Sequence, residues 1–261
     1  MKRLRLAALV LASVVLVPAT VRAQGQSITV LTCNIHHAQG TDGRVDVARV
    51  AEAVRGADIV GLEEVDVHSA RSGFIDEARV IASRLGMNHV FGETQSWLWF
   101  MKYGNAILSR YPIVSSRNHD LPRLSERRRM LQADLRVGSQ VVHAFVAHLS
   151  LNQAERALQV AEIARLLART PGRKVLVGDF NARPTFPEIA TVERSMADAW
   201  DVRGGGPGYS FSSTNPRIRI DYVFVSPIGI RVDSVRVRNP RQADGSQPSD
   251  HLPVEARITV Q

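Results

Sequence analysis

A carboxylate and a carboxamide stand two residues apart at the end of an apolar run. The segment "VLVGDFNARP" covers residues 175–184, and its apolar part is followed by Asp179 and Asn181. Asp and Asn are common in turns, because their side chains bond the nearby backbone and tolerate unusual φ and ψ angles. The same pair could instead form a site for a hard cation and a phosphate group. This segment alone leaves both interpretations open.

Polar residues stand at the ends of several other β-rich runs. They are Asn34, Glu63, Glu64, Asn105, His148, Asp221, Asp250 and His251. Each has a structural explanation when taken alone: Asn34 could cap a strand, and His148 could be a satisfied structural histidine. Asp221 is harder to explain in this way, because a buried carboxylate needs a partner. The number of such positions favours a functional site.

Together these side chains would offer carboxylates, carboxamides and histidines, without an evident serine or cysteine nucleophile beside a base. Oxygen ligands of this kind suit Mg²⁺ or Mn²⁺. Histidines nearby could donate to a phosphate or hold a water molecule, and a carboxylate bonded to a histidine fixes its tautomer. The indicated reaction is metal-assisted attack of water on a phosphate ester.

Short β-rich runs and a few helical patterns must position these residues. Apolar residues at positions i, i+3, i+4 and i+7 predict helices within 46–56 and 76–86, and a third from about Gln153 to Arg169. The runs Leu131–Val137 and Val141–Ala147 predict a hairpin. We therefore expect an α/β protein whose sheets are covered by helices and are mixed or antiparallel.

Residues 1–23 have the layout of a secretory signal peptide. A basic start is followed by an apolar run from Leu6 to Val17 and by small residues before a plausible cleavage point. This run is shorter than the ~20 residues of a spanning helix, so an uncleaved membrane anchor is the alternative. We expect residues 24–261 to form one domain, exported to the periplasm or secreted.

Charge and cysteine content narrow the class of protein further. The whole chain carries a formal net charge of +8, but Lys2, Arg3, Arg5 and Arg22 lie in the expected leader, so the mature part is only mildly basic. Charge alone therefore gives little support to nucleic-acid binding. The single cysteine, Cys33, excludes an intrachain disulfide and is expected to be a buried small hydrophobe.

An ordered series of motifs strongly resembles the endonuclease/exonuclease/phosphatase superfamily. The motifs are "TCNI" (32–35), "LEEV" (62–65), "GNAILSR" (104–110), "AHLS" (147–150), "GDFNARP" (178–184), "RIDYVF" (219–224) and "SDHLPV" (249–254). More narrowly, "NIHHAQGTDGRVD", "GNAILSR" and "SDHLPV" are similar to a bacterial branch of metal-dependent hydrolases related to the lipid-remodelling hydrolase domain of GPI-anchor biosynthesis. The resemblance implies a four-layer α/β sandwich, in which helices flank two packed mixed β-sheets and the active site lies at one edge.

The resemblance also implies a metal-binding role for three residues. Glu64 matches the principal metal ligand, Asn34 a residue that helps to hold metal and phosphate, and Asp250 a second carboxylate on the metal side. The family usually has glutamine before the ligand glutamate, where this sequence has Glu63. If the motif is displaced by one residue, Glu63 is the ligand instead.

The remaining motif residues match catalytic positions of the family. Asp179 matches the residue that aligns or deprotonates the attacking water, and Asn181 the residue that orients the phosphate oxygens. His148 matches a donor to the phosphate in the transition state. His251 matches a histidine that bonds phosphate or water, and Asp221 the carboxylate that orients it.

Substrate contacts are less well specified. We name His37, Asn105 and Arg129 as candidates: His37 could line the entrance or be a surface histidine, and Arg129 belongs to the segment "SERRRM", which could contact phosphates or be a solvated loop. The segment "SWLWFMKYG" (96–104) is expected to be a strand buried on both faces. If it were exposed, its aromatic residues would favour a lipid substrate.

We therefore expect an exported, Mg²⁺- or Mn²⁺-dependent phosphoesterase. The favoured activity is that of a phosphodiesterase that hydrolyses a lipid-linked or small organic phosphate ester, in a monomer with peripheral membrane contact. A secreted DNA or RNA endonuclease is the alternative within the same class, although nucleic acid is the less favoured partner. A catalytically silent binding domain of the same fold is the alternative from another class, and the complete set of motif residues argues against it.

Overall fold

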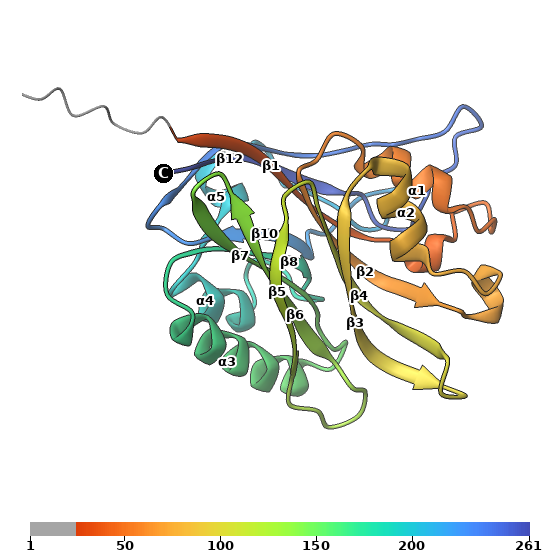
Figure 1. Ribbon diagram of the computed structural model, residues 1–261, viewed down its shortest axis with the longest axis horizontal. Coiled ribbons are helices and arrows are strands. Elements are labelled where there is room, and N and C mark those ends of the chain that lie inside the picture. The colour runs from red at the N-terminus through yellow and green to blue at the C-terminus, as the bar shows by residue number, and fades with distance from the viewer. Residues whose placement is uncertain (1–24) are drawn as a thin grey trace, which may run out of the picture.

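Two six-stranded β-sheets form the centre of the computed structural model, which describes residues 25–261 (Figure 1). The first sheet has the order β11 (Ile230–Val237), β12 (Val254–Val260), β1 (Gln26–Asn34), β2 (Ile59–Val67), β4 (Met101–Ser109), β3 (Asn88–Trp97). The second has the order β5 (Ile113–Asp120), β6 (Arg129–Val137), β7 (Gln140–His148), β8 (Arg173–Asp179), β10 (Asp221–Val225), β9 (Ala197–Asp198). The predicted signal peptide lies outside the described residues.

Both sheets are mixed, as expected. In the first sheet β1 and β2 are parallel, in the second β7 and β8 are parallel, and the other pairings are antiparallel. The predicted hairpin is confirmed, because β6 and β7 pair antiparallel from Met130 opposite Ala147 to Val137 opposite Gln140.

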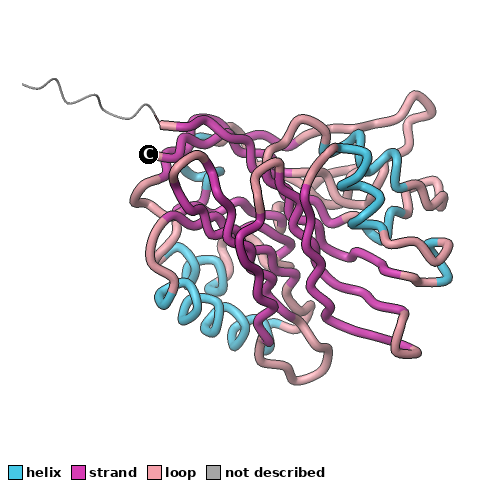
Figure 2. Tube along the Cα trace, viewed as in Figure 1, coloured by secondary structure: helices cyan, strands magenta, loops and turns pink. Residues whose placement is uncertain are grey.

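Helices cover the outer faces of the sheets (Figures 1 and 2). α1 (Val47–Val54) and α2 (Glu77–Leu85) pack on the first sheet, and α3 (Gln153–Arg169) and α4 (Pro187–Glu193) on the second. α5 (Ala199–Arg203) contacts β10 and β11, one strand of each sheet, and the short 3₁₀ helices are η1 (His36–Ala38) and η2 (Ala70–Ser72). The three helices predicted from periodicity are confirmed as α1, α2 and α3. Two of them begin with an aspartate cap, since Asp46 accepts from the Ala48 N–H at 2.8 Å and Asp76 from the Arg79 N–H at 3.0 Å.

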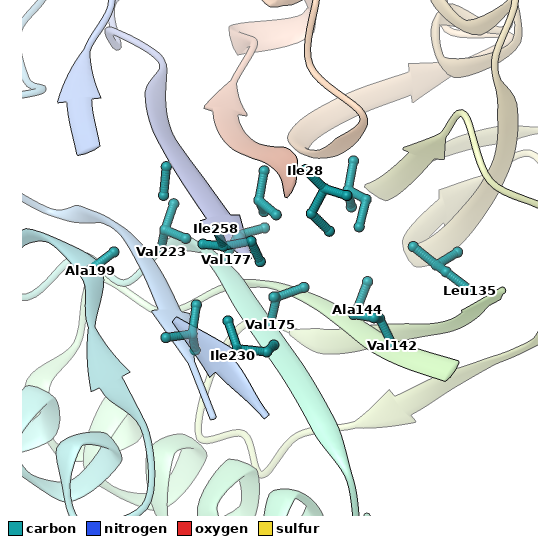
Figure 3. Packing of buried hydrophobic residues seen from close by; sticks show 14 of the residues in the cluster. Ile28, Leu135, Val142, Ala144, Val175, Val177, Ala199, Val223, Ile230 and Ile258 are labelled. Carbon is teal, nitrogen blue, oxygen red and sulfur yellow. The ribbon is translucent and has the colours of Figure 1, made fainter. Parts of the chain in front are cut away.

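Three buried layers of apolar side chains hold the sandwich together. Between the sheets, residues such as Ile28, Val177 and Ile258 pack against one another (Figure 3). A second cluster joins α1 and α2 to the first sheet and includes Cys33, which is buried as predicted. A third joins α3 and α4 to the second sheet. The expected four-layer α/β sandwich is therefore confirmed.

The prediction of a doubly buried strand across residues 96–104 was wrong. Residues 98–100 form the turn between β3 and β4, and the side chains of Trp97, Leu98 and Trp99 are 47%, 70% and 88% exposed. Alternation of apolar residues cannot distinguish a buried strand from a hairpin tip that projects beyond its neighbours. None of the helices in residues 25–261 is long and apolar enough to cross a membrane.

Candidate active site

The topology brings the polar strand ends to one edge of the sandwich. Parallel strands end at the same edge, so the last residues of β7 and β8, His148 and Asp179, lie opposite each other. Strand β10 runs antiparallel to β8 and begins at this edge with Asp221, which lies opposite Asp179. Gly178 permits the close approach of β7 and β8, because a Cβ at this position would lie 1.9 Å from the Ala147 carbonyl oxygen.

The carboxylate of Asp179 is the centre of the site. Its Oδ2 accepts a hydrogen bond from Asn34 Nδ2 at 3.2 Å, which links the edges of the two sheets. The same oxygen lies 3.4 Å from His148 Nε2 and 3.7 Å from His251 Nε2. Its Oδ1 accepts from the Asn181 backbone N–H at 2.9 Å. The sequence-predicted residues from both sheets thus converge on one buried carboxylate.

His251 is held by a carboxylate on its far side. Its Nδ1 lies 3.1 and 3.0 Å from the two oxygens of Asp221, both residues are buried, and the ring of Phe211 packs against the imidazole at a centroid distance of 4.7 Å. A histidine bonded through Nδ1 keeps its Nε2 available for a second partner. The predicted contact between Asp221 and His251 is therefore present.

The two histidines differ in protonation. Burial acts to lower the pKa of His251, but the carboxylates of Asp221 and Asp179 outweigh it and raise the pKa to about 10. Burial, together with the positive charges of Arg128 and His251, holds the pKa of His148 well below its usual range. His251 is therefore an imidazolium at neutral pH, and His148 is a neutral imidazole.

Asp179 is poised to exchange a proton near neutral pH. Burial raises its pKa to about 7, although the charge of His251 and the hydrogen bonds from Asn181 and Asn34 oppose this rise. A general base is most effective when its pKa lies near the operating pH. Asp179 thus has both the central position and the proton affinity that the role requires.

Asn181 is fixed by its backbone and by its amide. Its φ of 48° lies in the left-handed region, which Asn tolerates better than most residues. Its Nδ2 donates to the Leu149 carbonyl at 3.0 Å. The residue lines the same cavity as Asp179, where its amide is in place to orient a bound group.

Glu63 and Glu64 lie in a β-bulge of β2 and have different environments. The pairing of β2 with β4 shifts between Leu62 and Val65, and Glu64 has a φ of 60°. Glu64 lines the cavity and accepts from Asn34 Nδ2 at 3.1 Å. Glu63 is fully buried, its Oε1 accepts from Thr32 Oγ1 at 2.8 Å, and burial and the charge of Asp221 raise its pKa well above the usual range.

The residues near Glu64 fit a hard divalent cation. Asp250 lines the same cavity as Glu64, and Asn34 bridges Glu64 to Asp179. Carboxylate and amide oxygens are the ligands that Mg²⁺ and Mn²⁺ prefer. Glu64 therefore suits the ligand role better than Glu63, whose carboxyl faces the interior. The ligand assignment stays a prediction.

The cavity in front of Asp179 has a volume of about 410 Å³. Its walls combine cationic and apolar side chains, among them Arg128, Arg183, Phe186, Phe211 and Ile220. Arginine matches the geometry of phosphate oxygens, and the apolar walls offer room for an organic substituent. The cavity suits an organic phosphate ester.

The three residues predicted to bind substrate lie in different environments. His37 is buried beside Glu64. Asn105 is buried and donates through Nδ2 to the Arg129 carbonyl at 3.1 Å, so it anchors the backbone at the start of β6. The Arg129 guanidinium bonds Asp120 and the Glu93 carbonyl, each at 2.8 Å, and does not line this cavity.

Arg128, rather than Arg129, is the arginine of "SERRRM" at the cavity. Successive residues of an extended chain point to opposite sides, so neighbouring arginines cannot share one environment, and the sequence did not fix which one faces inward. Arg183 and Phe211 also line the cavity, and the sequence analysis did not name them as candidate site residues. Arg183 stands two residues beyond Asn181, a spacing that could have identified it, whereas Phe211 carries no such signal. Arg219, the first residue of the motif "RIDYVF", does not line the cavity, because its guanidinium is buried against Asp198.

Comparison with known proteins agrees with this geometry. Residues 31–251 match the Endonuclease/Exonuclease/phosphatase family. The uncharacterized protein YbhP of Escherichia coli strain K12 is 29% identical over 260 residues, which cover 91% of this chain and 98% of YbhP. Protein cwh43 of Schizosaccharomyces pombe is 33% identical over 138 residues, which cover 50% of this chain and 14% of that protein.

Solved structures show the same fold. The crystal structure of an endonuclease/exonuclease/phosphatase from Beutenbergia cavernae DSM 12333 is 24% identical, has a TM-score of 0.73, and covers 90% of this chain and 72% of that one. The resemblance drawn from the ordered motifs is thereby confirmed. The chain belongs to the endonuclease/exonuclease/phosphatase family.

Proposed function

We propose that this protein is a divalent-metal-dependent phosphodiesterase that acts on a lipid-linked or small organic phosphate ester outside the cytoplasm. Family membership makes it a hydrolase of the phosphoesterase or nuclease type. The observation that carries the proposal is the convergence of Asn34, His148 and His251 on the carboxylate of Asp179. The signal-peptide pattern of residues 1–23 supports export.

The described side chains divide the work of hydrolysis. A cation held by Glu64, with Asn34 and Asp250 beside it, would polarise the phosphate and stabilise the charge that develops on it. Asp179 accepts a proton from the attacking water, because its buried carboxylate has a pKa of about 7. Asn181 orients a non-bridging phosphate oxygen from a backbone that is already fixed.

The two histidines act as donors to the phosphate. His251 is cationic and carries its charge next to Asp179, so it stabilises negative charge on the phosphorus oxygens as the transition state forms. His148 is neutral and places Nε2 near the same carboxylate. Asp221 does not contact the substrate in this scheme; it keeps His251 charged and correctly oriented.

An exposed aromatic hairpin supports a lipid-linked substrate. Trp97, Leu98 and Trp99 lie at the tip of β3 and β4, and this tip projects beyond Glu64, because β4 pairs with β2 from Gly104 opposite Val65 to Lys102 opposite Val67. The tip therefore lies at the same end of the sheet as the candidate site (Figure 1).

The loop that follows β2 also exposes an apolar side chain and contacts β4 through an arginine. Phe74 is 58% exposed in the loop that follows β2, whose Arg71 lies over the ring of Tyr103 at 5.7 Å. Tryptophan and neighbouring basic residues are typical of surfaces that contact the lipid–water boundary. The hairpin tip would bring the site to a lipid headgroup.

Parallel substrate assays test the proposal. We expect metal-dependent cleavage of bis(p-nitrophenyl) phosphate faster than of p-nitrophenyl phosphate, and cleavage of a phosphodiester lipid in vesicles. Plasmid cleavage without vesicle hydrolysis would favour a nuclease and refute the lipid assignment. No cleavage of any ester under these conditions would refute the phosphodiesterase proposal.

Trp99→Ala tests the lipid part separately. Burying a large apolar side chain contributes about 2 kcal/mol, so its loss should weaken vesicle hydrolysis by more than about tenfold. Hydrolysis of the soluble diester should not change, because Trp99 lies outside the cavity. Ile228→Ala is the matched control, since Ile228 is 83% exposed but follows the opposite end of β10. Equal vesicle activity in both variants and the wild type would contradict lipid docking by the hairpin.

A further inference from the structure

Two consecutive histidines next to the candidate site have an unusual backbone conformation. His36, His37 and Ala38 have φ angles of 47°, 43° and 56°. Residues other than glycine are uncommon in this left-handed region, and each costs about 1–2 kcal/mol. Such a run persists only where the surroundings impose it, and it marks side chains that the fold holds in a defined place.

Hydrogen bonds impose this conformation. Asn34 Oδ1 accepts from the His36 N–H at 3.1 Å. The Ile35 carbonyl accepts from the Ala38 N–H, and the Ala38 carbonyl from the Asp46 N–H, each at 2.9 Å. Ala38 is fully buried, so the segment is anchored at both ends. The backbone that carries the His36 and His37 side chains is therefore held in a fixed conformation.

Both imidazoles point toward carboxylates of the candidate metal site. One nitrogen from each histidine and one oxygen of Glu64 all lie within 4.8 Å of one another. His36 Nδ1 also lies 3.9 Å from an oxygen of Asp250. Both histidines thus lie close to Glu64, and His36 also lies close to Asp250, the second carboxylate that is predicted to lie beside the cation.

One ring nitrogen of His37 is buried without a hydrogen-bond partner among the described residues. Its side chain is 8% exposed, and its Nδ1 is buried without a hydrogen-bond partner among residues 25–261. An unpaired buried nitrogen costs about 1–3 kcal/mol. A bound ligand would explain why the fold keeps an imidazole here, beside Glu64, rather than an apolar side chain.

We propose that His36 and His37 are nitrogen ligands of the cation that Glu64 binds. This inference rests on the metal site of the proposed function and adds its selectivity. Carboxylate oxygens alone suit Mg²⁺, whereas imidazole nitrogens favour first-row transition metals, whose affinities rise from Mn²⁺ through Fe²⁺ and Co²⁺. The site therefore takes Mn²⁺ or a later transition-metal ion in preference to Mg²⁺.

Pulsed electron paramagnetic resonance of Mn²⁺ bound to the metal-free protein tests this directly. The expected signal is coupling to ¹⁴N that changes to ¹⁵N coupling when histidine is ¹⁵N-labelled. The signal should disappear in the variant His36→Asn/His37→Asn. Asparagine is chosen because it tolerates the left-handed backbone, so the fold should persist. His89→Asn, an exposed histidine at the start of β3, is the matched control and should retain the signal.

Calorimetric titration of the metal-free proteins supplies the second measurement. Loss of even an outer partner of a metal ligand costs about 10- to 100-fold in affinity, so the double variant should bind Mn²⁺ and Co²⁺ at least about tenfold more weakly. Its affinity for Mg²⁺ should change far less. Absence of histidine coupling in wild-type protein with bound Mn²⁺, or an equal loss for Mg²⁺ and Co²⁺, would overturn the proposal.

The two proposals can fail separately. Nitrogen coupling in a protein that hydrolyses no phosphate ester would refute the proposed function and leave the histidine ligands in place. Ester hydrolysis with Mn²⁺ but without histidine coupling would retain the function and refute the histidine ligands. Because the wild-type spectrum is decisive on its own, failure of a variant to fold does not prevent the test.

Discussion

The free energy of unfolding of the wild-type protein should fall as pH rises, because of the buried carboxyl of Glu77, and Glu77→Gln should abolish this part of the fall. Glu77 is the first residue of α2 and is fully buried. Its Oε2 accepts from the Asp66 N–H at 2.7 Å, while its Oε1 has no hydrogen-bond partner among the described residues. Burial raises its pKa from 4.5 to about 8, although the bond from Asp66 opposes the rise. Glutamine keeps an acceptor oxygen there and does not titrate.

The sign and size of the effect follow from this pKa. A carboxyl group whose folded pKa is raised contributes stability that is fully present below the unfolded pKa and is lost as pH rises through the folded pKa. The window therefore runs from about pH 4.5 to pH 8. Each pH unit inside it costs about 1.4 kcal/mol, so the wild type should lose about 2.5 kcal/mol between pH 5 and pH 7 relative to Glu77→Gln.

Urea unfolding of both proteins at pH 5, 6, 7 and 8, in the presence of a chelator, measures this difference. The free energy of unfolding of the variant should exceed that of the wild type by an amount that grows with pH. Glu52→Gln is the control, because Glu52 is exposed on α1 beside Arg55 and should show no such growth. Parallel pH profiles for wild type and Glu77→Gln would refute the reasoning.

The remaining predictions concern the candidate site. His251→Ala and Asp221→Asn should each lower kcat/KM, and the double variant should be no worse than the poorer single variant, because Asp221 acts through His251; losses that multiply would contradict this. Glu63→Gln should leave metal activation nearly unchanged, since the Glu63 carboxyl faces the interior. A loss of metal activation as large as that of Glu64→Gln would show that Glu63 is the ligand. Arg128→Ala should lower kcat/KM for the soluble diester by about 10- to 100-fold, the size of a lost charged hydrogen bond, whereas Arg129→Ala should change it little, and equal effects would contradict the cavity assignment.

Much of the fold could be predicted because the spacing of apolar residues in each segment matches the helix or strand that the segment forms in the structure. The apolar spacing in α1, α2 and α3 predicts each helix, since the same side chains meet a sheet. The hairpin of β6 and β7 is predicted by two short runs and a tight turn. The segment around Trp99 failed, because sequence alternation does not report how far a hairpin extends beyond its neighbours.

The site could be predicted from the sequence less completely than the fold could, although the sequence correctly indicated that its central residues lie close together. Ordered motifs brought together Asp179, His251 and Asp221, whose contacts the structure shows. The sequence could not show which arginine of "SERRRM" points into the cavity, because the direction of each side chain depends on where β6 begins. The β-bulge at Glu64 also has no signal in the sequence, since it depends on the pairing of β2 with β4.

Hydrolysis of bis(p-nitrophenyl) phosphate by wild type and Asp179→Asn tests the central claim most directly. Both proteins are first stripped of metal and then assayed with Mg²⁺ or Mn²⁺ restored, and their circular dichroism and melting temperatures are compared. The wild type should be inactive after chelation and active with metal, while the variant should remain folded and lose at least about 100-fold in kcat, the lower range of a general base. A folded Asp179→Asn protein with wild-type, metal-dependent activity would contradict the assignment of Asp179 as the centre of catalysis.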